Sequence, residues 1–598
     1  MNVEHRIYNI MITNNIKKYL AAGFVCCGLS VALSSCTDFL TIYPTDRIVG
    51  ENFWKNKSDV DQMVDGCYLS MINSEIQTRA IIWGAYRSDE LVKLSSYNNT
   101  TLDNINALNI LPTMGYCSWE HFYKVINNCN IVLNHAPEVM ELDPEFTEGD
   151  YQVVRAQMLA LRSLCYFYLV RAFRDVPYIT HSVEDDSQVE YLPQSAPGEV
   201  LQYCLDDLQE ARKYIMKSGG YGENDWRNWG YITLDAVDAI MADIYLWRAS
   251  MTHSNEDYQK VVECVDKVID AKDAYYKLNN TDKIGTGEED RYHLLTGMTA
   301  LLQLFHPDYQ NSRESILEWQ YNGVNNSNSA LESHYYKMNK DATDGTLMAS
   351  KIFNSIEATA NKAQGQKVYF SENDYRFWNN VYKVDVNNTE AEQLPIRKMV
   401  YAESSPTVTT ASMNKSSSRS FDNYQQNWIV YRITDLMLMK AEALVAMSTD
   451  ADVAKLTQAF NLVQVVNKRS MVKNAKDSLN VTDYPTKDDM ELLVLAERER
   501  ELCFEGKRWF DLLRYCYRGM EGVDIFETLN SQATAPKLRK QMTEFITRKY
   551  KAGEGDAVTY KMDVEPYLYW PVLESEMKVN NLLKQNPVWI QEKSTSKN

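Results

Sequence analysis

Several motifs that mark common enzymes and metalloproteins are missing from this chain of 598 residues. Its eight histidines show no HExxH or HxxxH spacing, which argues against a metal hydrolase. Its 11 cysteines include no CxxC pair, so the ligand spacing of a zinc site is absent. There is no GxSxG nucleophile elbow and no glycine-rich P-loop. The sequence therefore predicts no metal site, no cofactor and no catalytic centre of these kinds.

Basic residues are also in short supply. The chain has 62 Lys and Arg against 81 Asp and Glu, which gives a formal net charge of −19. A protein this acidic repels phosphate groups, which argues against nucleic-acid binding and against a surface that lies flat on anionic lipid. After the N-terminal region no stretch approaches the length of about 18 apolar residues that a membrane span needs, so none is predicted there.

Cysteine is scattered along the chain and does not form the pattern of a disulfide framework. Most cysteines beyond the N-terminal region lie within helical patterns, and we expect most of them to be buried, small apolar side chains. One or two disulfide bridges stay open as an alternative for an exported chain. These cysteines are Cys67, Cys117, Cys129, Cys165, Cys204, Cys264, Cys503 and Cys516.

The N-terminal region has the pattern of an export signal. Lys17-Lys18 precedes an uncharged run over residues 20–33, which is too short to cross a bilayer but fits the core of a signal peptide. Residues 33–36 (LSSC) resemble the bacterial lipobox, which implies cleavage before Cys36 and acylation of that cysteine. Two or three acyl chains anchor a protein stably. The alternatives are a plain secretory signal with an incidental cysteine, and a true start at Met11.

Two blocks of the chain show the periodicity of paired helices. The first runs from about 118 to 272, and it includes a stripe of small residues at Ala239, Ala242 and Ala249 beside a larger apolar stripe. Two apolar faces indicate a helix that packs on both sides, as in stacked helical hairpins such as tetratricopeptide repeats. The sequence predicts helices in this block over 150–175, 198–217, 234–250 and 256–271.

The second helical block runs from about 425 to 519. Residues 428–447 and 452–470 predict one hairpin, and residues 486–519 predict a long charged helix. Between the blocks, residues 273–424 are polar and rich in Asn, Ser, Thr and Tyr, with a strand-like piece at 315–321. A long, loop-rich insertion on a helical scaffold is a frequent place for binding sites.

Four segments carry a resemblance to a known family. They are residues 36–54 (CTDFL, then YP, then NFW), 431–446 (YRITDLMLMKAEALVA), 497–515 (ERERELCFEGKRWFDLLRY) and 569–587 (YWPVLESEMKVNNLLKQNP). They resemble the SusD/RagB family of outer-membrane nutrient-binding lipoproteins of Bacteroidetes-type bacteria. The order and spacing of the segments extend over the whole chain after residue 35, and the 497–515 segment is the most specific of them.

The resemblance implies a mainly α fold: a scaffold of tetratricopeptide-like helical hairpins that carries an irregular, ligand-facing region. It divides the chain into a signal peptide (1–35), an N-terminal segment and tether (36–117), helical hairpins (118–272), a loop-rich ligand-facing region (273–424) and a C-terminal helical region (425–598). It also implies a role without catalysis. Such a protein captures oligosaccharide or peptide outside the cell, as the lid of a SusC-like TonB-dependent transporter in the outer membrane.

The 497–515 segment has one competing interpretation. Glu501 and Glu505 are spaced (i, i+4), which would put on one helix face the two carboxylates that glycoside hydrolysis uses. Interleaved Arg and Lys residues would hold both carboxylates ionised, whereas a general acid needs a raised pKa. We therefore interpret the segment as a structural network of ion pairs, with Phe504, Trp509 and Phe510 in the core.

Two regions offer the aromatic platforms and polar side chains that sugar binding needs. The first follows an SDEL-like segment that contains Asp89, and its loop holds Tyr97, Asn98 and Asn99. By its position after that segment, it resembles a ligand-contacting loop of the family.

The second region follows the 315–321 strand and holds Asn325, Asn326, Tyr335 and Tyr336. Tyr321 on the strand is a further candidate, although Tyr321 and its neighbour Trp319 can equally be core residues. Trp119, at the start of a helix, is assigned to packing. A faint calcium-loop pattern at 341–345 (DATDG) lacks the remaining ligands, so no calcium site is predicted.

The first functional hypothesis is therefore a glycan-binding surface lipoprotein. The second keeps the fold but changes the ligand to peptides, for which the acidic charge would favour basic sequences. The third, a surface hydrolase, needs a carboxylate pair or metal set in 273–424, and no convincing spacing occurs there.

Overall fold

The structure is a computed structural model of the whole chain. The chain divides into two compact units, Met1–Lys55 and Asn56–Asn598. The signal region and Cys36 lie outside the described residues, as do Tyr336, residues 341–344 of the faint calcium pattern and the low-complexity stretch 404–420. The structure describes residues 53–279, 288–296, 300–335, 345–354, 373–381, 393–400, 425–472, 478–520, 537–551, 553–562 and 565–589.

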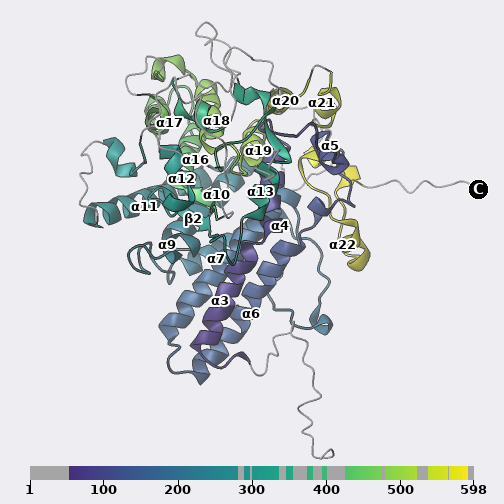
Figure 1. Cartoon of the computed structure of the whole chain (residues 1–598), viewed down its shortest axis with the longest axis vertical. Helices are drawn as coiled ribbons and strands as arrows, with labels where there is room; N and C mark the ends of the chain where they lie inside the picture. Colours follow the sequence, from purple (N-terminus) through teal and green to yellow (C-terminus); the bar gives the residue numbers. More distant parts are fainter. Residues whose placement is uncertain are drawn as a thin grey trace, which may run out of the picture. The chain divides into compact units, whose positions relative to one another are not determined.

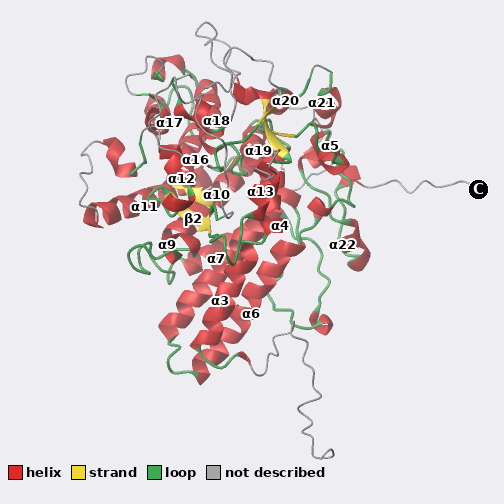
Figure 2. Cartoon of the chain, in the orientation of Figure 1, coloured by secondary structure: helices red, strands yellow, loops and turns green. Residues whose placement is uncertain are grey.

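Helices dominate the unit that begins at Asn56, and its described residues form two small sheets (Figures 1 and 2). This confirms the predicted mainly α class. The helices of the first half are α3 (Lys57–Met71), α4 (Ser74–Ile81), the π-helix η2 (Ile82–Tyr86), α5 (Thr100–Asn106), α6 (Glu120–Leu142), α7 (Glu148–Phe173), α8 (Pro197–Ala211), α9 (Arg227–Gly230), α10 (Leu234–Thr252) and α11 (Asn255–Asn279).

The long helices of this half pack one after another, as stacked hairpins require. Helix α3 packs against α6, α6 against α7, α7 against α8, and α10 against both α8 and α11. Figure 1 shows α3, α6 and α7 running side by side. The predicted helices at 150–175, 198–217, 234–250 and 256–271 are thus confirmed as α7, α8, α10 and α11, with shifted ends.

Helix α7 is the central element of this stack. It begins at a capping box, in which the side chain of Thr147 accepts a hydrogen bond from the backbone of Asp150 and the side chain of Asp150 accepts one from the backbone of Thr147. By length and composition α7 could cross a membrane, but 89% of its most apolar window is buried inside the protein. Burial on all sides identifies it as the core helix of the stack.

The second half begins with short elements and ends in a second helical group. The bounds are α12 (Ala300–Phe305), α13 (Ser329–Tyr335), α14 (Tyr375–Asn379), α16 (Ile433–Ala446), α17 (Val453–Ser470), α18 (Lys487–Leu502), α19 (Arg508–Arg518), α20 (Lys537–Thr547), α21 (Asp556–Met562) and α22 (Glu574–Val579). Helix α16 packs against α11, α17 and α18, which continues the stack from the first half into the second.

Two predictions about this half need correction. The expected helix over 428–447 begins only at Ile433, because Trp428–Arg432 forms the strand β5. The expected long helix over 486–519 is broken into α18 and α19. The chain turns between them at Phe504 and Gly506, whose φ angles are 67° and 71°. Glycine adopts this left-handed conformation without steric strain, so the turn at Gly506 has a low conformational energy.

The strands tie distant parts of the chain together. Strand β2 (Ser315–Trp319), expected from its sequence, pairs antiparallel with β5, and Trp319 lies opposite Trp428. A second sheet has the order β1 (Leu91–Lys93), β3 (Leu347–Ser350), β4 (Gln393–Leu394). Both sheets thus attach the region 273–424 to the helical scaffold.

The charged 497–515 segment forms a buried network of ion pairs, as predicted. The guanidinium of Arg432 binds Glu501 at 2.5 Å and Glu505 at 2.8 Å. Arg376 binds Glu497 at 2.8 Å and Glu501 at 3.0 Å. All five side chains are at most 3% exposed. Phe504, Trp509 and Phe510 are buried beside the network, which confirms their assignment to the core.

The charges around Glu501 and Glu505 keep both carboxyls ionised, which does not suit either of them to act as a general acid. Burial alone would raise the pKa of the Glu501 carboxyl, but the charges of Arg469, Arg432 and Arg376 outweigh burial and hold the pKa far below its usual range. The pKa of Glu505 is likewise lowered, because Arg432 and Lys398 outweigh its burial. The expectation that Glu501 and Glu505 share one helix face is wrong, however, because α18 ends at Leu502 and Glu505 lies beyond it.

The eight cysteines within the described residues are all buried. Burial raises the pKa of the Cys503 thiol, which therefore remains protonated. The described cysteines act as small apolar side chains, as predicted, and no disulfide joins any two of these eight.

Candidate functional site

Three of the predicted ligand contacts are corrected by the structure, because their side chains lie inside the protein. Asp89 is 1% exposed, and its carboxylate binds the guanidinium of Arg508 at 2.9 and 3.0 Å. Tyr335 is fully buried and donates a hydrogen bond to the carbonyl of Phe504 at 2.8 Å. Tyr321 is 4% exposed and donates to the side chain of Gln77 at 2.8 Å. All three hold elements together.

Two tryptophans are buried, which agrees with the core alternative for Trp319 and with the assignment of Trp119 to packing. Trp319 is 4% exposed and stacks on Trp428, with the ring centroids 6.5 Å apart. Trp119 is 4% exposed and packs edge-on against Phe173 at 5.3 Å. Asn325 and Asn326 do lie at the surface of a turn after β2, where Asn326 donates a hydrogen bond to the carbonyl of Gln320 at 3.1 Å.

The loop around Tyr97 remains at the surface. Tyr97 is half-buried and Asn98 is exposed, whereas the side chain of Asn99 accepts a hydrogen bond from Leu102 and caps α5. The ammonium of Lys93 donates to the carbonyl of Tyr97 at 2.5 Å, which fixes the base of the loop. Tyr97 and Asn98 therefore stay candidates for ligand contact, and Asn99 has a structural task of its own.

Two further residues, Tyr116 and Gln393, lie next to this loop. The pKa of the half-buried Tyr116 is raised, first by burial and then by its neighbour Tyr97, so two tyrosines lie near each other here. Gln393 of β4 accepts a hydrogen bond from the backbone of Ser95 at 3.0 Å and donates to the carbonyl of Lys93 at 2.9 Å. The loop is thus anchored to the 273–424 region, as a composite site requires.

A larger site lies between α3, α9 and β2. It is a cavity of about 490 Å³, which we call the aromatic cavity. Its residues are Gln62, Asp65, Gly66, Tyr68, Leu69, Met71, Ile72, Leu161, Leu164, Trp226, Gly230, Tyr231, Ile232, Leu317, Trp319, Gln320 and Asn326. Rings and aliphatic side chains form most of the lining, and a few amides and one carboxylate supply the polar groups.

The rings of the aromatic cavity hold one another in place. Tyr68 and Tyr231 stack with centroids 4.3 Å apart and planes 8° apart. Trp226 meets Tyr231 edge-on at 5.5 Å and is 47% exposed, so its face is accessible. The hydroxyl of Tyr231 donates to the carboxylate of Asp65. Fixed rings bind a flat apolar surface at a low cost in conformational entropy.

The cavity's amides complete a lining suited to a sugar. Gln62, Gln320 and Asn326 come from three different segments, and each offers both donors and acceptors. Of these amides, the sequence alone singles out Asn326. Tyr68 lies on a helix that follows the tether and Tyr231 in a short turn, and neither position differs in pattern from a core residue. Their convergence comes from the packing of α3 against the α9 segment, which no local pattern encodes.

Two family models match the sequence of this chain. A sequence model of the SusD family matches residues 247–589, more than half of the chain. The chain belongs to the SusD family. A second model, described as starch-binding and associating with the outer membrane, matches residues 38–246.

Curated relatives cover most of this SusD-family protein. SusD-like protein P38 of Formosa agariphila is 25% identical over 517 residues, which cover 81% of this chain and 88% of the relative. SusD-like protein P2 of the same organism is 22% identical, covering 83% of this chain and 91% of the relative.

Solved structures share the fold of this SusD-family protein. A SusD superfamily protein from Bacteroides thetaiotaomicron has a TM-score of 0.58 at 19% identity, covering 90% of this chain and 99% of that one. A structure described as a laminarin-binding SusD-like protein has a TM-score of 0.57 at 18% identity, covering 89% and 99%. The predicted scaffold of helical hairpins is therefore confirmed.

Proposed function

We propose that this protein captures oligosaccharide or polysaccharide at the cell surface and delivers it to a partner TonB-dependent transporter in the outer membrane. The family supports the proposal, since one matching model is described as starch-binding and associating with the outer membrane. A solved relative that binds laminarin supports a glycan as the cargo. The lipobox-like sequence at residues 33–36 supports a lipid anchor at Cys36 on the extracellular face.

The aromatic cavity is the observation that carries the proposal. Its volume of about 490 Å³ lies within the usual range for small-molecule sites, about 300–1,000 Å³. Sugars have apolar ring faces and polar edges, so they bind where aromatic side chains alternate with amides. Trp226 offers a half-exposed ring at the cavity, and Gln320 and Asn326 supply hydrogen bonds beside it.

Capture without catalysis fits the same lining. Glycoside hydrolysis by the usual route needs two carboxyl groups, one on each side of the scissile bond. Among the residues described around the cavity, Asp65 is the single carboxylate, and it accepts the hydroxyl of Tyr231. The Tyr97 loop is proposed as a second contact region, for which Tyr97 and Asn98 are the accessible side chains.

The test is ligand binding by the chain from Thr37 onward, which retains the whole Asn56–Asn598 unit. Affinity electrophoresis against a panel of polysaccharides identifies the glycan class, and calorimetry with oligosaccharides of that class gives the affinity. We expect Trp226→Ala to weaken binding at least tenfold. Tyr560→Ala is the matched control, because Tyr560 is 75% exposed on α21 and lies outside the cavity.

Three results would contradict parts of the proposal. Heat released on mixing with peptides, together with silence on every glycan, would assign the protein to peptide import. Turnover of a labelled glycan by the pure protein would make it a hydrolase. If the protein binds glycan and Trp226→Ala has the affinity of the parent, the glycan binds at a place other than the aromatic cavity.

A further inference from the structure

A second cavity of about 540 Å³ shares two walls with the aromatic cavity. In α9, Asn228 and Trp229 line this second cavity, whereas Gly230 lines the first. In β2, Ser315 and Ile316 line the second and Leu317 lines the first. We call it the lysine cavity. Its remaining residues are Arg212, Lys217, Ser218, Gly219, Leu234, Asp235, Asp238, Lys267, Asp270, Ala271, Lys272, Tyr275 and Tyr276.

Two opposite charges are buried in this cavity without touching each other. Lys272 is 8% exposed, and its ammonium donates a hydrogen bond to the carbonyl of Ser315 at 3.0 Å. Asp235 is 5% exposed and accepts from the hydroxyl of Ser218 at 2.7 Å. Within the described part of the chain, no ion pair joins either of them to another residue. An ammonium has three hydrogens to donate, so Lys272 retains capacity for a ligand.

The other charged groups leave the cavity with an excess of unpaired cations. Arg212 binds Asp238 at 2.7 Å, and Asp270 binds Arg291 at 2.7 Å. Lys217 and Lys267 are exposed and, like Lys272, have no ion-pair partner among the described residues. Asp235 is then the one unpaired carboxylate among the described residues that line the cavity with these lysines. The lining carries four basic side chains and three acidic ones, a formal excess of one positive charge in a protein with a formal charge of −19, and its lysines without ion-pair partners are suited to an anionic ligand.

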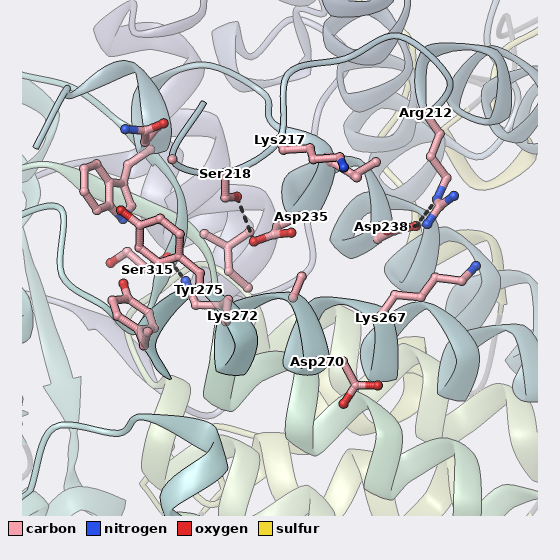
Figure 3. A pocket seen from close by; sticks show the side chains of 17 residues that line it. Arg212, Lys217, Ser218, Asp235, Asp238, Lys267, Asp270, Lys272, Tyr275 and Ser315 are labelled. Carbon is pink, nitrogen blue, oxygen red and sulfur yellow. Dashed lines mark hydrogen bonds and ion pairs between the residues drawn. The ribbon is translucent and has the colours of Figure 1, made fainter. Parts of the chain in front are cut away.

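Aromatic rings complete the cavity at one end. Tyr275 and Lys272 lie at that end, whereas Arg212, Asp238 and Lys267 lie at the other (Figure 3). The ammonium of Lys272 lies 5.7 Å from the centre of the Tyr276 ring. The Tyr275 ring packs so closely on the loop at Gly219 that a Cβ there would lie 2.5 Å from it. These rings can cover the apolar face of a sugar beside the buried charges.

From this arrangement we infer that the lysine cavity binds an anionic saccharide unit, a sugar ring that carries a carboxylate or a sulfate group. The anion receives charge-assisted hydrogen bonds from Lys272 and from Lys217 at the rim. Asp235 accepts a hydroxyl of the same ring, and the tyrosines cover its apolar face. The inference rests on the proposed glycan cargo. In addition to the aromatic cavity, the protein would have a second site that selects glycans with a negative charge.

The test compares three sugars with the same ring: glucose, glucuronate and glucose 6-sulfate, with inorganic sulfate as a fourth probe. Binding to the chain from Thr37 onward is measured by calorimetry and saturation-transfer NMR at low salt. We expect the charged sugars to bind at least tenfold more tightly than glucose, and 0.5 M salt to weaken them selectively. The tighter of the two charged sugars identifies the anionic group.

Variants locate the effect. Lys272→Met is expected to lower the affinity for the charged sugar at least tenfold, and the double variant Lys217→Ala, Lys267→Ala several-fold. Lys217 and Lys267 are exposed, so the double variant should fold normally and tests the inference even if Lys272→Met does not fold. Lys277→Met is the matched control, because Lys277 is on the same helix, pairs with Asp273 and lies outside the cavity. Its affinity should equal that of the parent.

Several outcomes would overturn the inference. One is equal affinity for glucose and the charged sugars; another is affinity within twofold of the parent in both lysine variants. Inorganic sulfate that binds as tightly as glucose 6-sulfate would reduce the site to an anion site without a sugar. If a neutral oligosaccharide still binds and responds to Trp226→Ala, the proposed function stands while this inference fails. Silence of the protein on all saccharides would overturn both.

Discussion

Gly84 and Gly506 pack backbone against backbone. A Cβ built on Gly84 would lie 1.8 Å from the carbonyl oxygen of Gly506, and one built on Gly506 would lie 2.6 Å from the carbonyl oxygen of Ala80. Gly84 lies in the π-helix η2, and Gly506 lies in the turn between α18 and α19. The close approach locks the N-terminal segment onto the charged C-terminal segment, and it explains why neither position has a side chain.

The first prediction follows from this contact. Gly84→Ala should destabilise the protein by about 3 kcal/mol or more, because backbone atoms cannot yield as a flexible side chain can. Urea unfolding followed by circular dichroism measures the loss. Gly66→Ala is the control, since a Cβ there meets nothing within 4 Å and Gly66 lies inside helix α3. Replacing that glycine should stabilise the helix by about 0.5–1 kcal/mol. A similar, small effect of both substitutions would contradict the prediction.

The ion-pair network supplies the second prediction. Glu501 is fully buried and accepts hydrogen bonds from Arg376 and Arg432, so Glu501→Gln removes one negative charge shared by two buried guanidinium groups. Breaking a buried pair in this way costs about 3–5 kcal/mol. The same change at Glu263, whose pair with Lys260 is exposed, should cost at most about 1 kcal/mol. Denaturation of the two variants beside the parent gives both values, and equal losses would show that the network is not structural.

How far the sequence predicts this protein depends on whether a feature is local or long-range. The helices α7, α10 and α11 follow from periodicity, and the buried network follows from the alternation of acids and bases in 497–515. The break at Phe504–Lys507 does not, since a single glycine is a weak signal in an otherwise helical pattern.

The candidate sites show the same limit more strongly. Tyr335 and Tyr97 look alike in the sequence, as tyrosines in polar stretches, yet one is fully buried and the other half-buried. What separates them is a contact across the fold, the hydrogen bond from Tyr335 to the carbonyl of Phe504. The lysine cavity likewise brings together Asp235 and Lys272 from successive helices, and no sequence motif contains both residues.

A buried lysine supplies the third prediction. Burial lowers the pKa of Lys549 from 10.5 to about 7, only partly offset by the charge of Asp89. Its ammonium nitrogen donates to the carbonyls of Tyr86 and Leu91 at 3.0 and 3.3 Å, which two hydrogens of a neutral amine can satisfy. Between pH 7 and 10.5 the unfolded chain therefore holds a proton at this residue that the native chain lacks, and stability contributed by Lys549 rises with pH.

The measurement is the free energy of unfolding of the parent and of Lys549→Met from about pH 7 to about pH 10. The difference should move in favour of the parent by up to about 1.4 kcal/mol per pH unit across this window. Lys213→Met, at an exposed lysine paired with Glu210, should show no such trend. A flat difference for Lys549→Met would mean that this amine stays protonated in the fold.

The last prediction separates surface tyrosines from core tyrosines. Tyr97→Ala should weaken glycan binding by about tenfold and leave the unfolding midpoint unchanged, because the ring lies half-exposed on the loop beside Tyr116. Tyr335→Ala should instead lower the stability by about 3–5 kcal/mol, because it empties a fully buried site and leaves the carbonyl of Phe504 without its donor. At a temperature where both variants are folded, Tyr335→Ala should bind as the parent does. Loss of binding in a folded Tyr335→Ala, with full binding in Tyr97→Ala, would reverse the assignment and place the ligand next to α13.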